Sequence, residues 1–122
     1  MTGYVTARRV PLLPLRVRGP AGPPADFLAL LDTGFAGELS LPPAIAAAMG
    51  LVAKFSPSFT LADGASVSVP ICHAEVEWGP RWRPVEVLMI GPDPAVGMAL
   101  LEDHKVFMEV IAAGVIDIRP MP

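Results

Sequence analysis

FLALLDTGFAGELSL, residues 27–41, sets a carboxylate between two apolar segments. The residues from Phe27 to Leu31 are apolar throughout, which predicts a strand that is buried on both faces. Asp32-Thr33-Gly34 follows at the end of that strand, where a tight turn would hold the carboxylate rigidly and desolvate it on one side. Gly34 would let the backbone approach a neighbouring chain closely. In isolation the tripeptide favours a structural turn whose Asp side chain caps nearby amides, so the surrounding sequence has to decide.

Length and composition predict a single domain, residues 1–122, part of whose surface is covered by a partner. The chain has 122 residues, of which 52% are hydrophobic and 17% are charged. This length fits one domain, and so apolar a balance in a small protein indicates that some apolar surface is shielded. No stretch of about 18 apolar residues is present, so we expect no membrane span. The N-terminal region does not read as a signal peptide, and the simplest expected location is the cytoplasm.

The charge distribution argues against nucleic-acid binding. The net charge is −3, and the only basic cluster consists of Arg8, Arg9, Arg16 and Arg18, with no aromatic residues interleaved. We interpret this cluster as the solvated face of two edge strands.

Most of the chain reads as short strands separated by Pro- and Gly-rich turns, the pattern of an all-β barrel or sandwich. Pro42-Pro43, before an alanine-rich segment that ends at Gly50, predicts a short helix. Asp63-Gly64 predicts the tip of a β-hairpin. We expect a loop at 18–26, a turn at 79–81, strands at 4–8, 12–17, 27–31, 58–61, 65–69, 72–78, 84–90, 106–110 and 115–118, and helices at 44–49 and 98–101.

The strand at 72–78 alternates cleanly between apolar and polar residues, which predicts that Cys72, Ala74, Val76 and Trp78 face inward. Cys72, the only cysteine, therefore reads as a small buried hydrophobe rather than a nucleophile, and it excludes an internal disulfide framework. One cysteine and two scattered histidines give no recognisable metal-ligand spacing, and no phosphate or dinucleotide motif is present. We expect no metal and no cofactor.

The order of these features resembles the retropepsins, the single-lobed aspartic proteases of retroviral type. Leu30 to Gly34 matches the catalytic strand and loop of that family, and Thr60 to Ser66 falls where the family has its flap. Residues 87–101 run parallel to the segment that carries the family's second buried glycine and C-terminal helix. Phe35 after the glycine is similar to a prokaryotic Asp-Thr-Gly-Phe subgroup of clan AA. The resemblance implies an all-β, single-lobed closed barrel with one or two short helices.

Peptide hydrolysis by carboxylates requires two of them about 3 Å apart, sharing one proton because both cannot ionise together. The chain contains one Asp-Thr-Gly and no Asp-Ser-Gly, so a single copy cannot supply the pair. The resemblance therefore implies a symmetric homodimer with one Asp32 from each subunit on the two-fold axis. Such a dimer would be an aspartic endopeptidase acting on an extended peptide or protein substrate.

The resemblance also implies roles for the neighbouring residues. Thr33 would hydrogen-bond across the dimer axis, and Gly34 would present its backbone to the water and the substrate. Val96 and Gly97 would pack beneath the active-site loop. The flap tip would close over the peptide; it consists of Ala62, Asp63, Gly64 and Ala65. Asp63 departs from the glycine-rich flaps of viral members.

Two other classes remain open from the sequence. A non-catalytic dimeric β-barrel module of the same fold could bind extended peptides or a protein partner, and the residues do not separate it from a protease. The hypothesis that the chain is a regulator acting through its apolar surface rests on composition alone.

Overall fold

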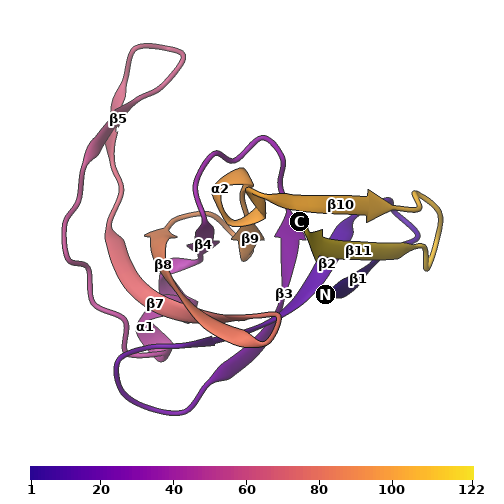
Figure 1. Ribbon diagram of the computed structural model, residues 1–122. Helices are drawn as coiled ribbons and strands as arrows, with labels where there is room; N and C mark the ends of the chain where they lie inside the picture. The colour runs from indigo at the N-terminus through magenta and orange to yellow at the C-terminus, as the bar shows by residue number, and fades with distance from the viewer.

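The structure, a computed structural model, describes residues 1–122 as a β-rich chain with two short helices (Figure 1). The helices are α1 (Pro43–Ala48) and α2 (Met98–Leu101). The strands are β1 (Thr2–Val5), β2 (Pro11–Arg18), β3 (Ala25–Leu31), β4 (Leu39–Leu41), β5 (Ser58–Thr60), β6 (Ser66–Ser68), β7 (Ile71–Trp78), β8 (Arg81–Met89), β9 (Ala95–Val96), β10 (His104–Met108) and β11 (Val115–Pro120). Neither helix has the length and hydropathy that crossing a membrane requires.

Six of the strands close into a barrel. The main sheet runs β10-β11-β1-β2-β3-β9-β4-β8-β7, and an additional pairing of β2 with β7 joins the ring β2-β3-β9-β4-β8-β7. The remaining strands β1, β11 and β10 extend from β2 as a side sheet that ends at β10. The predicted fold class, an all-β closed barrel with one or two short helices, is confirmed.

Apolar side chains at every second position of the strands fill the barrel interior. On β7 the predicted inward set of Cys72, Ala74, Val76 and Trp78 is buried, which confirms the predicted period of two. On β2, Leu13, Leu15 and Val17 are buried in the same way. The two helices also form where Pro-Pro and the segment after Gly97 predict them.

The prediction that residues 27–31 are buried on both faces is wrong. Along β3 burial alternates, with Ala29 and Leu31 in the core and Leu28 43% exposed. A barrel strand has one inner and one outer face, so a continuous apolar run leaves every second side chain outside. Those outer side chains add to the apolar surface of the isolated chain.

Three predicted boundaries also differ. The first strand ends at Val5 rather than Arg8, because the Thr6 carbonyl and hydroxyl bind the amides of Arg9 and Val10 in a turn. The loop predicted at 18–26 is shorter, since Arg18 belongs to β2 and Ala25 begins β3. Arg81 belongs to β8, because it pairs with Trp78 across a two-residue turn.

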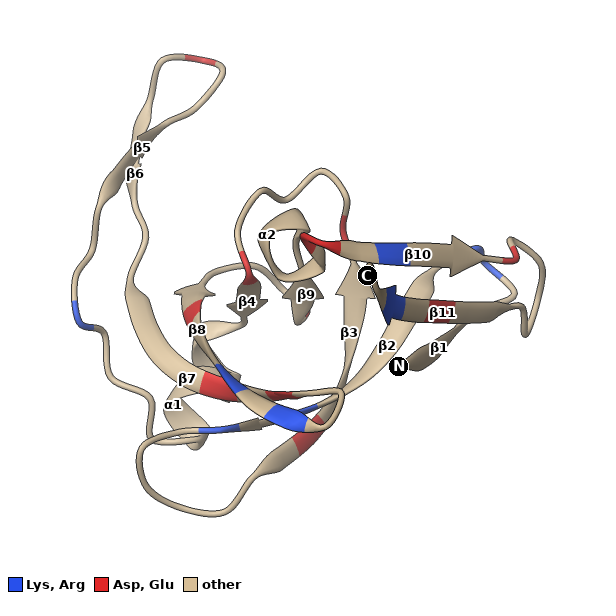
Figure 2. Ribbon diagram, in the orientation of Figure 1, with Lys and Arg blue, Asp and Glu red and all other residues tan.

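The basic cluster does not lie on two edge strands. Arg8 and Arg9 follow β1 in a turn. Arg16 and Arg18 lie on β2, which pairs with β1, β3 and β7 and is therefore not an edge strand. Arg16 Nε lies 2.8 Å from Asp26 Oδ1 and lowers the pKa of that carboxyl by hydrogen bonding. Arg18 Nε lies 3.0 Å from Glu75 Oε1. Figure 2 shows basic and acidic residues close together on these strands. The arginines of β2 are therefore paired with carboxylates and do not form a strongly positive surface.

Candidate active site

Asp32 stands at the end of β3 in a tight turn. Its amide donates to the carbonyl oxygen of Val96 at 2.9 Å, which continues the parallel pairing of β3 with β9 by one residue. Its Oδ1 accepts the Gly34 amide at 2.9 Å, and its carbonyl accepts the Phe35 amide at 3.1 Å. The position of the carboxylate is therefore set by one bond from the barrel and two within the turn.

The carboxylate is open to solvent in the single chain. Asp32, Thr33 and Gly34 are all exposed, so the one-sided desolvation expected from the sequence is absent from an isolated copy. Shielding of Asp32 would require another molecule, or another segment of the chain, to cover this loop.

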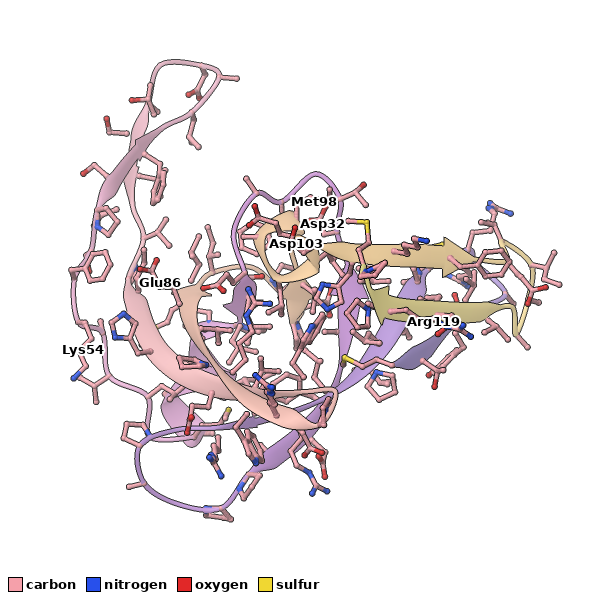
Figure 3. All side chains as sticks on the ribbon, viewed as in Figure 1. Asp32, Lys54, Glu86, Met98, Asp103 and Arg119 are labelled. Atoms are coloured by element: carbon pink, nitrogen blue, oxygen red, sulfur yellow. The ribbon has the colours of Figure 1, made fainter.

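The start of α2 lies under the active-site loop, residues 32–38. Three successive amides donate to carbonyl oxygens of this loop: Gly97 to Glu38 at 2.9 Å, Met98 to Phe35 at 2.7 Å, and Ala99 to Gly37 at 3.1 Å. Gly97 is buried and Met98 is 47% exposed. Figure 3 shows Asp32 and Met98 on the same side of the molecule. The structure thus brings Val96 and Gly97 together with Asp32.

Two charged residues that the sequence did not single out brace the same loop. Arg83 on β8 donates to the carbonyl oxygens of Leu100 at 3.3 Å and Ala99 at 3.4 Å, and its Nη2 lies 3.5 Å from Glu38 Oε2. Glu38 also accepts the Glu86 amide at 3.0 Å. Both side chains are partly buried. Arg83 and Glu38 therefore connect the active-site loop, α2 and β8.

A cavity of about 330 Å³ opens beside Asp32. Apolar side chains of Leu30, Phe35 and Ile90 line it, together with the carboxylate-bearing Asp93. The complete lining is Leu30, Asp32, Gly34, Phe35, Ser40, Ile90, Gly91, Pro92, Asp93 and Ala95. Before the structure is considered, the distant part of this wall is indicated only by the Gly- and Pro-rich turn at 91–94, within the segment of family resemblance.

The hairpin that contains the predicted flap residues stands away from this cavity. β5 and β6 form a separate two-stranded sheet, and Figure 1 shows their tip projecting from the barrel, apart from α2 and the end of β3. The tip residues, Ala62, Asp63, Gly64 and Ala65, are exposed. Asp63 Oδ1 accepts the Ala65 amide at 2.9 Å, and Gly64 has a φ of +86°, so the turn chemistry is as the sequence predicts. The structure does not bring these residues to Asp32.

The two faces of this hairpin differ in polarity. Phe59 pairs with Val67 on one face, whereas the other face carries only hydroxyl side chains: Ser58, Thr60, Ser66 and Ser68. Phe59 is 43% exposed, so an apolar face of the hairpin is available for contact.

Neither Cys72 nor a cluster of metal-ligating side chains offers another candidate site. Cys72 is buried, and desolvation raises the pKa of its thiol, so it is not activated as a nucleophile. No three His, Cys, Asp or Glu side chains are grouped as a metal site. A larger hollow of about 670 Å³ lies between Met1, Phe27 and Glu77, but Asp32 does not line it.

No protein-family model matches the sequence, and no curated protein is significantly similar to it. Among solved structures, the chain is similar to the crystal structure of a retropepsin-like aspartic protease from Rickettsia conorii, with a TM-score of 0.70. The match covers 97% of this chain and 89% of that one, at 15% sequence identity. This similarity shows that the chain has a retropepsin-like fold.

Proposed function

We propose that the chain is a homodimeric aspartic endopeptidase in which two Asp32 carboxyls, one from each subunit, activate a water molecule. The observation that carries the proposal is the position of Asp32. It follows a barrel strand of a retropepsin-like fold, bound through its amide to Val96 and through its carboxylate to Gly34, beside a cavity.

The proposed chemistry follows from two carboxyls about 3 Å apart that share one proton. The ionised carboxyl takes a proton from water, and the resulting hydroxide attacks the scissile carbonyl carbon. The protonated carboxyl donates its proton to the carbonyl oxygen, which gives a neutral tetrahedral intermediate. Collapse of this intermediate breaks the C–N bond as a carboxyl proton passes to the leaving amine. These steps need only the two carboxyls and water, and no cofactor.

The substrate would be an extended peptide. Leu30, Phe35 and Ile90 offer an apolar pocket for one side chain next to Asp32. Closure of the β5–β6 hairpin would bring its apolar face, with Phe59 and Val67, over the bound chain. In this proposal the exposed state of the hairpin is the open form that admits substrate.

The test is cleavage of a random peptide library, followed by mass spectrometry, with the parent protein and Asp32→Asn. The amide oxygen of Asn can still accept the Gly34 amide, so the turn should persist while proton transfer is lost. We expect the parent to cleave and the variant to be inactive. Asp26→Asn is the matched control, since it makes the same change at an exposed position of β3, the strand that Asp32 follows.

Two outcomes contradict the proposal. Cleavage by Asp32→Asn would exclude Asp32 as the catalytic residue. A dimeric parent that binds peptides but cleaves none between about pH 3 and about pH 7 would favour the non-catalytic β-barrel module instead.

A further inference from the structure

Asp93 is the second acidic residue of the cavity beside Asp32. Of the residues that line this cavity of about 330 Å³, Asp32 and Asp93 are the only charged ones. No lysine or arginine lines it. A substrate side chain that enters the cavity therefore meets two acidic residues and no basic one.

The Asp93 carboxylate has no partner within the chain. Four other aspartates accept a hydrogen bond through the carboxylate: Asp26, Asp32, Asp63 and Asp117. Asp93 is exposed, and neither a hydrogen bond nor an ion pair engages its carboxylate. Because this side chain does not cap its own turn, the turn does not depend on it. Its negative charge is available to a ligand.

The backbone on both sides of Asp93 is fixed. Pro92 and Pro94 flank it, and a proline restricts both its own φ and the conformation of the residue before it. The Ile90 amide donates to a carbonyl oxygen of β4 at 3.0 Å, and the Leu30 amide donates to the Pro94 carbonyl oxygen at 2.9 Å. These bonds tie both ends of the turn to barrel strands. The backbone of Asp93 is therefore held beside the end of β3, as a residue that selects substrates requires.

The apolar part of the cavity suits the stem of a long side chain. Leu30, Phe35 and Ile90 supply apolar surface. Lysine and arginine bury their aliphatic stems against such surface while their charged ends reach an acidic group or water. A glutamate side chain would instead bring a further negative charge into a cavity that already has two acidic residues. An uncharged side chain fills the apolar part but leaves the Asp93 carboxylate to water.

We infer that this cavity selects a lysine or arginine side chain next to the scissile bond, and that Asp93 is the residue that selects it. This inference rests on the proposed function, which sets the scissile bond beside Asp32. The Asp93 carboxylate accepts hydrogen bonds from the ammonium or guanidinium group of the substrate, while the Asp32 carboxyl acts on the water. In the symmetric dimer the second copy supplies the same cavity on the other side of the scissile bond, so both flanking positions favour basic side chains.

Matched peptide pools measure this selectivity. Three random pools differ only in a fixed central residue, which is lysine, norleucine or glutamate, and their random positions contain no charged residues. Norleucine has the four-carbon stem of lysine without its charge. Mass spectrometry gives the initial rate of cleavage on either side of the central residue. We expect the parent to cleave the lysine pool about tenfold faster than the norleucine pool, the effect of one charge-assisted hydrogen bond, and to cleave the glutamate pool slowest.

Substitution of Asp93 tests whether this residue carries the preference. Asp93→Asn should lower the ratio of the lysine to the norleucine rate to about one, and Asp93→Lys should cleave the glutamate pool faster than the lysine pool. Each ratio is measured within one variant, so it does not depend on the fraction of folded protein. Asp103→Asn is the matched control, because Asp103 is an exposed aspartate that does not line the cavity. It should keep the ratio of the parent.

Binding separates this inference from the proposed function. Fluorescence anisotropy of labelled pools should show that the lysine pool binds Asp32→Asn about tenfold more tightly than the norleucine pool, and that Asp93→Asn added to this variant removes the difference.

Each outcome decides one proposal or both. A parent that cleaves the lysine and norleucine pools equally overturns the role of Asp93 and leaves the peptidase proposal intact. Equal loss of the preference in Asp93→Asn and Asp103→Asn overturns that role as well, because overall charge would then explain the preference. A parent that cleaves nothing but binds the lysine pool through Asp93 overturns the peptidase proposal and supports the basic-side-chain site. Neither cleavage nor binding of any pool overturns both.

Discussion

Gly97 lies directly against Phe35, at the point where α2 supports the active-site loop. A Cβ atom added to Gly97 would lie 2.6 Å from Phe35 Cδ2 and 2.7 Å from the Phe35 carbonyl oxygen, and it would overlap the carbonyl oxygen of Gly37. Its φ is −103°, so close packing, not an unusual backbone conformation, requires glycine here.

Gly97→Ala should therefore destabilise the protein, by about 2 to 3 kcal/mol, because the obstructing atoms include backbone that cannot move aside. Urea denaturation measures the change. Gly34→Ala is the matched control, since its Cβ would meet only Asp32 Oδ1, at 3.3 Å. We expect Gly34→Ala to keep its stability within about 1 kcal/mol and to lose peptidase activity, because its methyl group would obstruct the water site. Equal stability of the two variants would contradict the packing argument.

Arg83→Met should lower stability by about 1 to 2 kcal/mol, because it removes hydrogen bonds to two α2 carbonyls and the ion pair with Glu38. The control is Arg119→Met, whose 77% exposed side chain is paired with Asp117 at the surface. That change should cost less than about 1 kcal/mol. Thermal unfolding measures the stability of both variants. An equal loss of stability in the two would mean that Arg83 does not brace the loop.

Peptidase activity should have a bell-shaped pH profile that peaks at acid to mildly acid pH. Hydrolysis needs one ionised and one protonated Asp32 carboxyl, so activity falls when both are protonated at low pH and when both are ionised at higher pH. Steady-state kcat/KM across the pH range measures this. A profile that rises steadily to alkaline pH would contradict a shared proton.

Residues 60–66 should exchange amide hydrogens much faster than residues 27–31. The hairpin belongs to a separate two-stranded sheet with exposed side chains, whereas β3 is bonded on both sides within the barrel. Hydrogen exchange read by mass spectrometry or NMR tests this. Equal protection of the two segments would argue against a moving flap.

Cys72 should resist alkylation in the folded protein and react after unfolding. Burial raises the pKa of its thiol, so less thiolate is present in the folded state at any given pH. The unfolded chain loses this proton first, near the ordinary thiol pKa of about 8.5, so Cys72 contributes stability below that pH that is lost as pH rises toward the folded-state value. Iodoacetamide labelling with and without urea measures the difference, and rapid labelling of the native protein would contradict it.

Much of the fold follows from local patterns. The alternation at 72–78 predicts which side of β7 is buried, because one face of a barrel strand meets the core. Pro42-Pro43 and Gly50 bound α1 through backbone preferences that need no tertiary contact. The same local reasoning fails at 27–31, where a continuous apolar run predicts two buried faces although the outer face is open.

The sequence by itself determined that a carboxylate, Asp32, ends an apolar strand in a glycine turn, and that one chain holds only one such motif. Only the tertiary structure decided what surrounds it. The parallel partner of β3 comes from residues 95–96, the brace comes from Arg83, and the cavity wall comes from Ile90 and Asp93. Local periodicity encodes which face of an element is buried, whereas contacts between distant segments depend on the order in which strands join a sheet, which no short stretch specifies.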